Sequence, residues 1–415
     1  MLYTEIKQCR ICGNTNLLPI INLGNLSLTG VFPGVGEKVE SGPLEMVRCA
    51  GSASEACGLV QLKHNYDLVK LYGDNYGYRS GLNSSMVDHL GKISAQALEL
   101  VRPKAGDLVI DIASNDGTLL RSYPVSLGLD LIGIDPTIKK FGKYYSENIT
   151  AIPDFFSAAN IKQLTSKKAK IITSIAMFYD LEHPVDFMKQ IEGTLDDEGV
   201  WIFEQSYMPS MIKLVSYDTI CHEHLEYYAM RQIKWMAERA GLKIIDVIFS
   251  DANGGSFRVV AAKNQSVFAT KEEVINKIIQ DEESAGFWSD KIYEDFVKNI
   301  LNHRDNLKQM IAEINSSGKK IFGYGASTKG NVILQFCGLT IKDLPCIAEV
   351  NEYKFGRLTP GANIPIISEK QAKELKPDYF LVLPWHFRIN IINREKNYLA
   401  NGGHLFFPLP KPEII

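Results

Sequence analysis

The sequence predicts an α/β protein in three parts: a cysteine-rich N-terminal domain, a central Rossmann-like domain and a second Rossmann-like domain at the C-terminal end. Four cysteines fall within the first 57 residues, and strand-like apolar runs alternate with helical stretches from residue 108 to residue 206. A second strand, glycine loop and helix begin near Lys319. Such alternation is typical of a parallel sheet wound on both faces. The expected parts are 1–65, 66–265 and 313–415, with a helical linker at 266–312.

The composition is that of a globular protein with a small ligand. The chain has 415 residues, 45% of them hydrophobic, and a formal net charge of -3. It has no long basic run to attract nucleic acid or an anionic membrane, and no apolar run approaches the roughly 20 residues of a membrane helix. The start "MLYTEIKQC" lacks the order of a signal peptide. We therefore expect a cytoplasmic monomer that binds neither nucleic acid nor a membrane.

The first candidate site is a set of four cysteines. Cys9 and Cys12 stand in "CRICG", and Cys49 and Cys57 stand in "RCAGSASEACG". A Cys-x-x-Cys pair on a turn that ends at Gly13, followed by a wider pair, suits tetrahedral Zn²⁺ and predicts a zinc-binding domain. Four thiolates leave no position open for water, which indicates a structural role. The alternative is four unrelated buried cysteines.

A polar, glycine-rich turn precedes a helix in "GDNYGYRSGLNSSMVDHLGKISAQALELV". Apolar residues from Met86 to Leu98 recur at helical spacing. Tyr76, Tyr78 and Arg79 lie on the turn before this helix. Exposed tyrosines on a loop are often plain surface residues, so a functional role for this turn depends on what lies beside it.

The central part opens with the layout of a first nucleotide-binding βα unit. An apolar strand at 108–112 leads into the turn "DIASNDG" and then a helix. The second strand, in "LDLIGIDPT", ends at Asp135, which is placed to accept hydrogen bonds from ribose hydroxyls. Further strands are expected in "ITAIPDFFS", "AKIITSIAMFYD" and "EGVWIFEQSY". We predict one parallel sheet from these five strands.

The turn after the first strand indicates the cofactor. A dinucleotide fold favours several glycines, which let the backbone approach a pyrophosphate, whereas this turn has one, Gly117. The acid-led turn suits S-adenosylmethionine, which has no phosphate and carries a sulfonium and an amino group that Asp111 can face. A nicotinamide or flavin site, or no ligand, are the alternatives. The candidate cofactor residues are Asp111, Ala113, Asn115, Asp116, Gly117, Asp135, Phe155 and Phe156.

The stretch "YDTICHEHLEYY" at 217–228 gathers titratable side chains just beyond a strand end. His222 and His224 share a face only in an extended strand, and Cys221 and Glu226 do not complete a metal site in any regular conformation. A buried, hydrogen-bonded core histidine is the second interpretation. The third is a general base, because a neutral imidazole can take a proton near neutral pH while a neighbouring carboxylate fixes its tautomer.

The C-terminal part repeats the nucleotide-binding pattern after the charged, helical linker. "KKIFGYGASTKGNVILQFCGL" predicts a strand, a glycine loop and a helix, and further strands are expected in "LPCIAEV", "PDYFLVLPWHF" and "GGHLFF". Backbone amides at the helix start form an anion seat, with Lys329 and Arg357 as charge partners for phosphates. This pattern suggests a nucleotide substrate. The candidate substrate-binding residues are Tyr78, Arg79, Gly323, Gly325, Lys329, Asn331 and Arg357.

The order of these motifs resembles the S-adenosylmethionine-dependent sugar C-methyltransferases that act on nucleotide-linked 4-keto-6-deoxysugars. The Cys-x-x-Cys pair, "SNDGTLL", "YDTICHEHLEYY", "GYGASTKGN" and "GRLTPGANIPI" follow the family's order over essentially the whole chain. The resemblance implies a zinc domain, a class I methyltransferase domain and a C-terminal Rossmann-like domain that helps to hold the nucleotide-sugar. It also implies methyl transfer to the third carbon of a sugar linked to thymidine or guanosine diphosphate, in branched-sugar biosynthesis.

Carried over residue by residue, the resemblance implies that His224 removes the proton from the third carbon of the sugar, with Glu223 beside it as its orienter and Tyr76 near the sugar. It also implies that His183, in "LEHP", steadies the developing enolate. A ketone at the fourth carbon acidifies the neighbouring proton, and hydrogen-bond donors at its oxygen stabilise the enolate. The third carbon can then attack the sulfonium methyl group.

Three positions depart from the family pattern. Cys221 stands where relatives carry a tyrosine, Ala113 replaces a glycine of the cofactor turn, and His386 stands where an asparagine is common. Two further functions stay open beside the leading one. They are methyl transfer to an oxygen or another carbon, and nucleotide-sugar binding by a protein that kept the fold and lost the chemistry.

Overall fold

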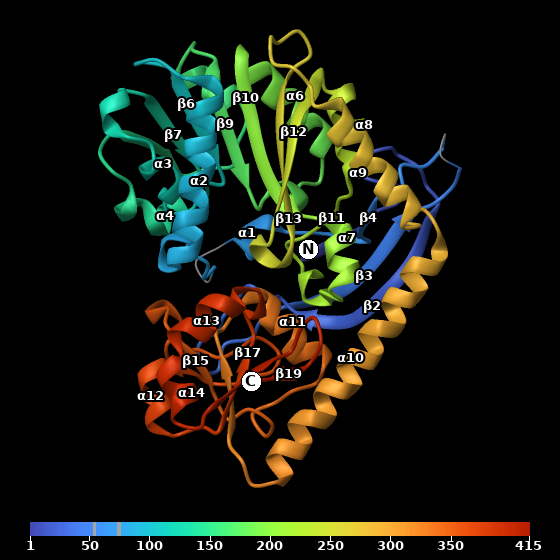
Figure 1. Cartoon of the computed structure of the whole chain (residues 1–415), viewed down its shortest axis with the longest axis vertical. Coiled ribbons are helices and arrows are strands. Elements are labelled where there is room, and N and C mark those ends of the chain that lie inside the picture. Colours follow the sequence, from blue (N-terminus) through green and yellow to red (C-terminus); the bar gives the residue numbers. More distant parts are fainter. Residues whose placement is uncertain (53–54, 73–75) are drawn as a thin grey trace.

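The structure is a computed structural model that describes residues 1–52, 55–72 and 76–415, and these residues form four β-sheets. In Figure 1 the central sheet lies above the C-terminal sheet, and the N-terminal strands curve along one side of the junction between them. Within the described ranges, we find no helix with both the length and the apolar character to cross a membrane.

The N-terminal sheet includes a strand from the middle of the chain. β11 follows the "CHEHL" segment and pairs antiparallel with β4, so that Glu226 lies opposite Gln61. The segment that carries the histidines is therefore fixed to the N-terminal part as well as to the central one. The sheet order is β11 (Glu226–Tyr227), β4 (Val60–Leu62), β3 (Ser41–Cys49) and β2 (Leu17–Ser27). A separate pair is formed by β1 (Tyr3–Glu5) and β5 (His64–Tyr66).

The five predicted central strands form a parallel sheet, as expected. Two further strands extend its edge through antiparallel pairings: β13 pairs with β10, and β12, which a short turn joins to β13, pairs with β13. β13 therefore runs opposite to the parallel strands, and β12 runs with them. The sheet is therefore mixed. Its order is β12 (Leu242–Ser250), β13 (Ser256–Lys263), β10 (Leu195–Ser206), β9 (Ala169–Ile175), β6 (Leu108–Ile112), β7 (Asp130–Ile134) and β8 (Ile149–Ile152).

Helices cover both faces of this sheet because successive strand residues point to opposite sides. Val109 packs on the α2 side with Ile93, whereas Ile110 packs on the α6 and α8 side with Ile191 and Met236. The side chain of Asn83 caps the first turn of α2. The helices of this part are α1 (Leu68–Leu71), α2 (Ser84–Val101), α3 (Thr118–Arg121), α4 (Ile138–Phe141), α5 (Ala158–Leu164), α6 (Pro184–Thr194), α7 (Met208–Lys213) and α8 (Met230–Arg239).

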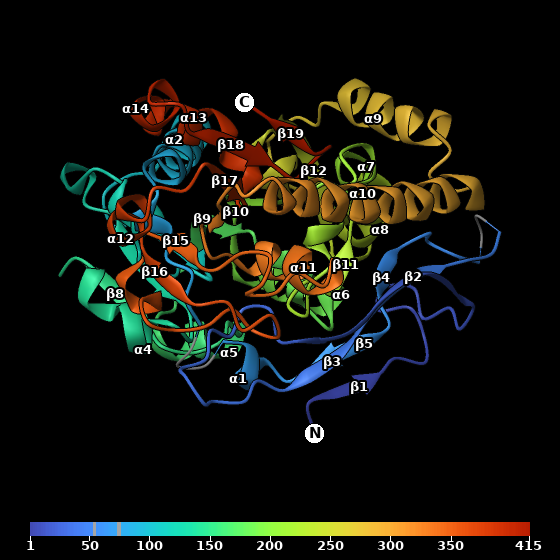
Figure 2. The same ribbon diagram turned by 90° about the horizontal axis from the view of Figure 1, so that it is seen from below.

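Two helices connect the central and C-terminal sheets, in agreement with the predicted helical linker. They are α9 (Glu272–Ser284) and α10 (Asp290–Ser316). With 27 residues, α10 is about 40 Å long, and it runs along the side of the molecule past the N-terminal strands to the C-terminal part (Figure 1). Its buried side chains join the core that the N-terminal and C-terminal sheets share. Figure 2 shows the molecule from below, with α10 and α11 close to each other in this view.

The C-terminal sheet has the predicted strand, glycine loop and helix at its centre. β14 (Ile321–Tyr324) lies between two parallel neighbours, and the side chain of Ser327 accepts a hydrogen bond from the Gly330 N–H at the start of α11 (Thr328–Phe336). The other strands are β16 (Ile366–Ser368), β15 (Ile347–Glu349), β17 (Tyr379–Val382), β18 (His404–Phe407) and the antiparallel β19 (Glu413–Ile414). The other helices are α12 (Glu369–Glu374), α13 (Arg388–Arg394) and α14 (Lys396–Ala400).

Candidate active site

The four N-terminal cysteines converge on one point. Their sulfur atoms all lie within 4.8 Å of one another, with Cys9 Sγ 3.5 Å from Cys57 Sγ and Cys12 Sγ 3.4 Å from Cys49 Sγ. Four thiolates around Zn²⁺, each about 2.3 Å from the ion, are separated from one another by about 3.8 Å. The cluster therefore fits a zinc ion with a complete ligand shell, and it fastens the first turn of the chain to the end of β3.

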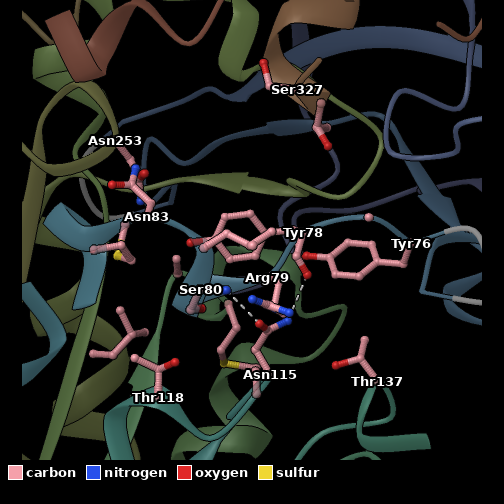
Figure 3. A pocket seen from close by; sticks show the side chains of 18 of the residues that line it. Tyr76, Tyr78, Arg79, Ser80, Asn83, Asn115, Thr118, Thr137, Asn253 and Ser327 are labelled. Carbon is pink, nitrogen blue, oxygen red and sulfur yellow. Dashed lines mark hydrogen bonds between the residues drawn. The ribbon is translucent and has the colours of Figure 1, made fainter. Parts of the chain in front are cut away.

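A cavity of about 860 Å³ lies between the carboxyl ends of the central parallel strands and the start of α11. Open α/β sheets bind their ligands at this edge, and the volume is in the range of cofactor and substrate sites. Figure 3 shows its wall near the cofactor turn. Predicted site residues on this wall are Tyr76, Tyr78, Arg79, Asp111, Ala113, Asn115, Asp135, Phe155, Phe156, Glu223, His224, Gly325 and Lys329.

The turn after β6 shapes the cofactor end of the cavity. Ala113, Asn115 and Gly117 all have positive φ angles, which folds the turn tightly against the sheet. The side chain of Asn115 accepts a hydrogen bond from the Ser80 N–H at 3.0 Å and donates one to the Tyr78 carbonyl oxygen at 3.2 Å (Figure 3). The turn before α2 is thereby fixed against the cofactor turn.

Two carboxyl groups give this end its chemistry. Asp111 accepts a hydrogen bond from the Thr173 hydroxyl at 2.6 Å, and burial raises the pKa of Asp111 to about 7. Asp135 lines the cavity, and its oxygens accept hydrogen bonds from the N–H of Asn115 and from both the N–H and the hydroxyl of Thr137. Asp135 thus holds two turns in place besides lining the cavity. Acidic groups beside an apolar wall fit the sulfonium and amino groups of S-adenosylmethionine.

The apolar wall comes from the segment after β8. The Phe155 side chain is 42% exposed, and the Phe156 ring packs on Phe187 with the ring centroids 5.3 Å apart. Both rings line the cavity, and their contact with the cofactor stays a prediction.

His224 occupies the middle of the cavity wall in a defined tautomer. Its Nδ1 atom lies 2.8 Å from the Thr219 carbonyl oxygen, and because a carbonyl only accepts, Nδ1 carries the proton. Nε2 is therefore the unprotonated nitrogen. Burial, together with the positive charge of Lys329, lowers the pKa of His224 to about 3, so the ring is neutral. The prediction that a neighbouring carboxylate fixes this tautomer is wrong, because the Thr219 backbone does so.

Glu223 is the chain neighbour of His224 and makes no hydrogen bond to its ring in the described part of the chain. The Thr29 hydroxyl donates a hydrogen bond to Glu223 Oε2 at 3.4 Å, and Oε1 has no hydrogen-bond partner among the described residues. Burial raises the pKa of Glu223 and of the nearby Cys221 thiol. Gly30 passes so close that a Cβ atom there would lie 2.2 Å from Glu223 Oε1. Glu223 therefore lines the cavity and leaves no room for a side chain at residue 30.

His222 corresponds to the core-histidine interpretation of the motif. It is fully buried, its Nε2 atom lies 3.3 Å from the Gly42 carbonyl oxygen, and its ring packs edge-on against Tyr66 at 4.9 Å between centroids. Burial lowers its pKa to about 4, so it is neutral. The two histidines of the motif thus divide into one that faces the cavity and one that holds the N-terminal sheet.

The C-terminal wall supplies a buried cation. Lys329 donates a hydrogen bond to the Asn253 carbonyl oxygen at 2.8 Å, and burial lowers its pKa. The ring of His386 lines the cavity next to it, and burial together with the Lys329 charge lowers the pKa of His386 well below its usual value. This wall therefore presents the Lys329 cation beside a neutral imidazole, with Lys354 and Arg394 also lining it.

Six predicted site residues do not line the cavity. His183 is exposed at the start of α6, and Asp116 is occupied by hydrogen bonds from Thr118 and the Gly81 N–H. Arg357 donates to the Phe32 carbonyl oxygen, and so braces the N-terminal part instead of facing a phosphate. The remaining three are Gly117, Gly323 and Asn331.

Several cavity residues were missed from the sequence. Asp180 follows β9, Lys354 lies beyond β15, and Ser327 caps α11. Ser327 and Asp180 could have been found, because each follows an apolar strand at the edge where ligands bind. Lys354 follows β15 in the same way, its Nζ donates to the Ala326 carbonyl oxygen at 2.7 Å, and it lies 4.3 Å from the centroid of the Phe32 ring.

Family models match three consecutive parts of the chain. A zinc binding domain matches residues 9–72, a methyltransferase domain matches 87–247, and a C-methyltransferase C-terminal domain matches 251–410. The methyltransferase match decides against the nicotinamide and flavin alternatives. It also decides against a binding protein without enzyme function.

C-methyltransferase NovU from Streptomyces niveus is 28% identical over 417 residues, which cover 99% of this chain and 97% of NovU. Two solved structures resemble a smaller part. The CcbJ methyltransferase from Streptomyces caelestis matches 42% of this chain and 89% of its own at 13% identity and a TM-score of 0.33. A methyltransferase from Clostridium acetobutylicum matches 43% and 90% at 12% identity, also with a TM-score of 0.33. The chain belongs to the S-adenosylmethionine-dependent C-methyltransferase family, with S-adenosylmethionine and Zn²⁺ as its cofactors.

Proposed function

We propose that the protein adds a methyl group to the third carbon of a nucleotide-linked 4-keto-6-deoxyhexose, with His224 as the base. The observation that carries this proposal is the tautomer of His224, whose unprotonated nitrogen belongs to a ring that lines the cavity. A carbon next to a ketone becomes nucleophilic once its proton is removed, and a positioned imidazole is a suitable base. The zinc cluster is closed by four thiolates and takes no part in this step.

The two ends of the cavity suit the two reactants, S-adenosylmethionine and the nucleotide-linked sugar. S-adenosylmethionine, held by Asp111, Asn115 and the Phe155 ring, supplies a methyl group attached to a sulfonium. Lys329 stands on the opposite wall and suits an anionic diphosphate. A sugar between these walls would lie next to His224 and Glu223.

The charge of Lys329 adds a link between substrate binding and the strength of the base. In the protein without ligands, this charge contributes to the low pKa of His224. A diphosphate bound beside Lys329 would offset the charge and raise the proton affinity of Nε2. His224 would therefore become a stronger base when the nucleotide-sugar is in place.

The test is incubation with 4-keto-6-deoxyglucose linked to thymidine diphosphate or to guanosine diphosphate, in deuterated buffer. Without S-adenosylmethionine, we expect the hydrogen at the third carbon to exchange for deuterium, as NMR would show. With S-adenosylmethionine, we expect a new quaternary carbon and no methoxy signal. A methoxy product would identify an O-methyltransferase, and a methyl group at another carbon would refute the assignment of the third carbon. Light scattering of the same sample tests the proposed monomer.

A further inference from the structure

The proposed reaction needs a hydrogen-bond donor at the ketone oxygen of the substrate, and no residue has yet been assigned to this task. Removal of the proton moves an electron pair to the ketone oxygen, and enzymes stabilise such an oxyanion with a hydrogen-bond donor placed at it. The resemblance pointed to His183 for this task, but His183 is exposed and lies outside the cavity wall. A donor must come from another residue.

Asp180 is a carboxyl group in the cavity wall that no other role explains. It ends the short helix η4 (Phe178–Asp180) after β9 and lines the cavity. Its Oδ2 atom accepts a hydrogen bond from the Tyr72 hydroxyl at 2.7 Å. Its Oδ1 atom is shielded from solvent and has no hydrogen-bond partner in the described part of the chain. A buried polar atom without a partner is costly unless a ligand completes it.

One backbone hydrogen bond joins the segment that carries Asp180 to the segment that carries His224. The Leu225 N–H donates to the Tyr179 carbonyl oxygen at 2.8 Å, and His224 and Asp180 are the chain neighbours of these two residues. The rings of Tyr179 and His224 also pack together, with centroids 4.3 Å apart. His224 and Asp180 also both line the cavity, so one substrate can contact both side chains.

The surroundings of Asp180 favour the neutral acid. No cation is paired with it among the described residues, and Glu223 adds a second acidic group nearby. Burial and this like charge raise the pKa of Asp180 well above its usual value. A carboxyl group in such a site keeps its proton and can donate a hydrogen bond. With Oδ2 occupied by Tyr72, the proton belongs on Oδ1.

We infer that Asp180, as a neutral carboxylic acid, donates a hydrogen bond from Oδ1 to the ketone oxygen of the substrate. This role rests on the proposed function. The proton of the third carbon passes to His224 Nε2, and its electron pair moves onto the ketone oxygen, which Asp180 stabilises. The pair then forms the bond to the methyl carbon as the sulfonium–methyl bond breaks. The ketone is restored, Asp180 keeps its proton, and His224 releases its proton to solvent.

Infrared difference spectroscopy tests the protonation state without any substrate. At neutral pH, the spectrum of the unaltered protein minus that of Asp180→Asn should show the carbonyl band of a protonated carboxylic acid. Asp186→Asn is the matched control, because the Asp186 side chain is exposed on α6 and paired with Lys189. A carboxylate band for Asp180 would overturn the inference, whichever substrate the enzyme takes.

Deuterium exchange at the third carbon tests the role itself, with 4-keto-6-deoxyglucose linked to thymidine diphosphate as the probe. We expect Asp180→Ala to slow exchange by about 10²-fold, as loss of an oxyanion donor does. Asp180→Asn, which keeps an N–H donor, should lose less, and both variants should bind S-adenosylmethionine with unchanged affinity. Exchange in Asp180→Ala within threefold of the parent rate, or an equal loss in Tyr76→Phe alone, would overturn the role of Asp180. An inactive parent would overturn the proposed function instead.

Discussion

Replacement of His224 by glutamine tests the base directly. In the folded protein, the Thr219 carbonyl holds the proton on Nδ1, and the pKa of about 3 keeps the ring neutral at any pH used for assays. Glutamine keeps a similar length and an N–H that can reach Thr219, but it has no basic nitrogen. A positioned general base contributes about 10²–10⁴ in rate, which is about 2.7–5.4 kcal/mol in the activation barrier. We expect kcat to fall by that factor.

The assay follows methyl transfer and hydrogen exchange at the third carbon together, with S-adenosylmethionine affinity measured by calorimetry. Both rates should fall in His224→Gln while the affinity stays within about twofold, because the cofactor turn lies on another part of the wall. His222→Gln is the matched control, since His222 is fully buried against the N-terminal sheet and does not line the cavity. A near-native exchange rate in His224→Gln would refute the assignment of the base.

Three further perturbations have defined outcomes. Cys9→Ser should lower the zinc content measured by atomic absorption and reduce the melting temperature, and full zinc content would contradict the four-thiolate site. The affinity for S-adenosylmethionine should rise as pH rises through about 7, because Asp111 ionises there and its carboxylate faces a cation; Asp111→Asn should abolish this dependence. Gly30→Ala should shift the carboxyl end of Glu223, since its Cβ would lie 2.2 Å from Oε1, and lower kcat; unchanged turnover in both Gly30→Ala and Glu223→Gln would show that Glu223 takes no part in the reaction.

The local pattern of the sequence was sufficient for most of the fold. The five central strands, the helical linker and the strand, loop and helix at 321–336 follow from apolar periodicity and turn residues, and they occur where predicted. The antiparallel edge formed by β12 and β13 was not predicted, because strand direction depends on how the chain returns and not on the composition of the strands.

The candidate site was only partly accessible from the sequence. Side chains at the ends of parallel strands, such as Asp111 and Asp135, could be placed in the cavity because all parallel strands end at the same edge. Asp116 and Arg357 carry charges that suit a ligand, and they lie close in sequence to residues that line the cavity. Their side chains instead form hydrogen bonds with the Thr118 hydroxyl and the Phe32 carbonyl oxygen, and these bonds stabilise the fold. Lys354 is held in the cavity wall by the Ala326 carbonyl oxygen of its own domain and by the Phe32 ring of the N-terminal part.

The sequence by itself determined the cysteine cluster, the turn after the first central strand and the segment that carries the proposed base, because each is a local arrangement of residue types. The tertiary structure alone decided which histidine faces the cavity, since β11 pairs with β4 and directs His222 into the N-terminal sheet and His224 toward the cofactor. It also decided that the Thr219 carbonyl fixes the tautomer of the base and that Asp180 is left with an unpartnered oxygen. Burial and partners set protonation states, and these arise only when distant segments meet.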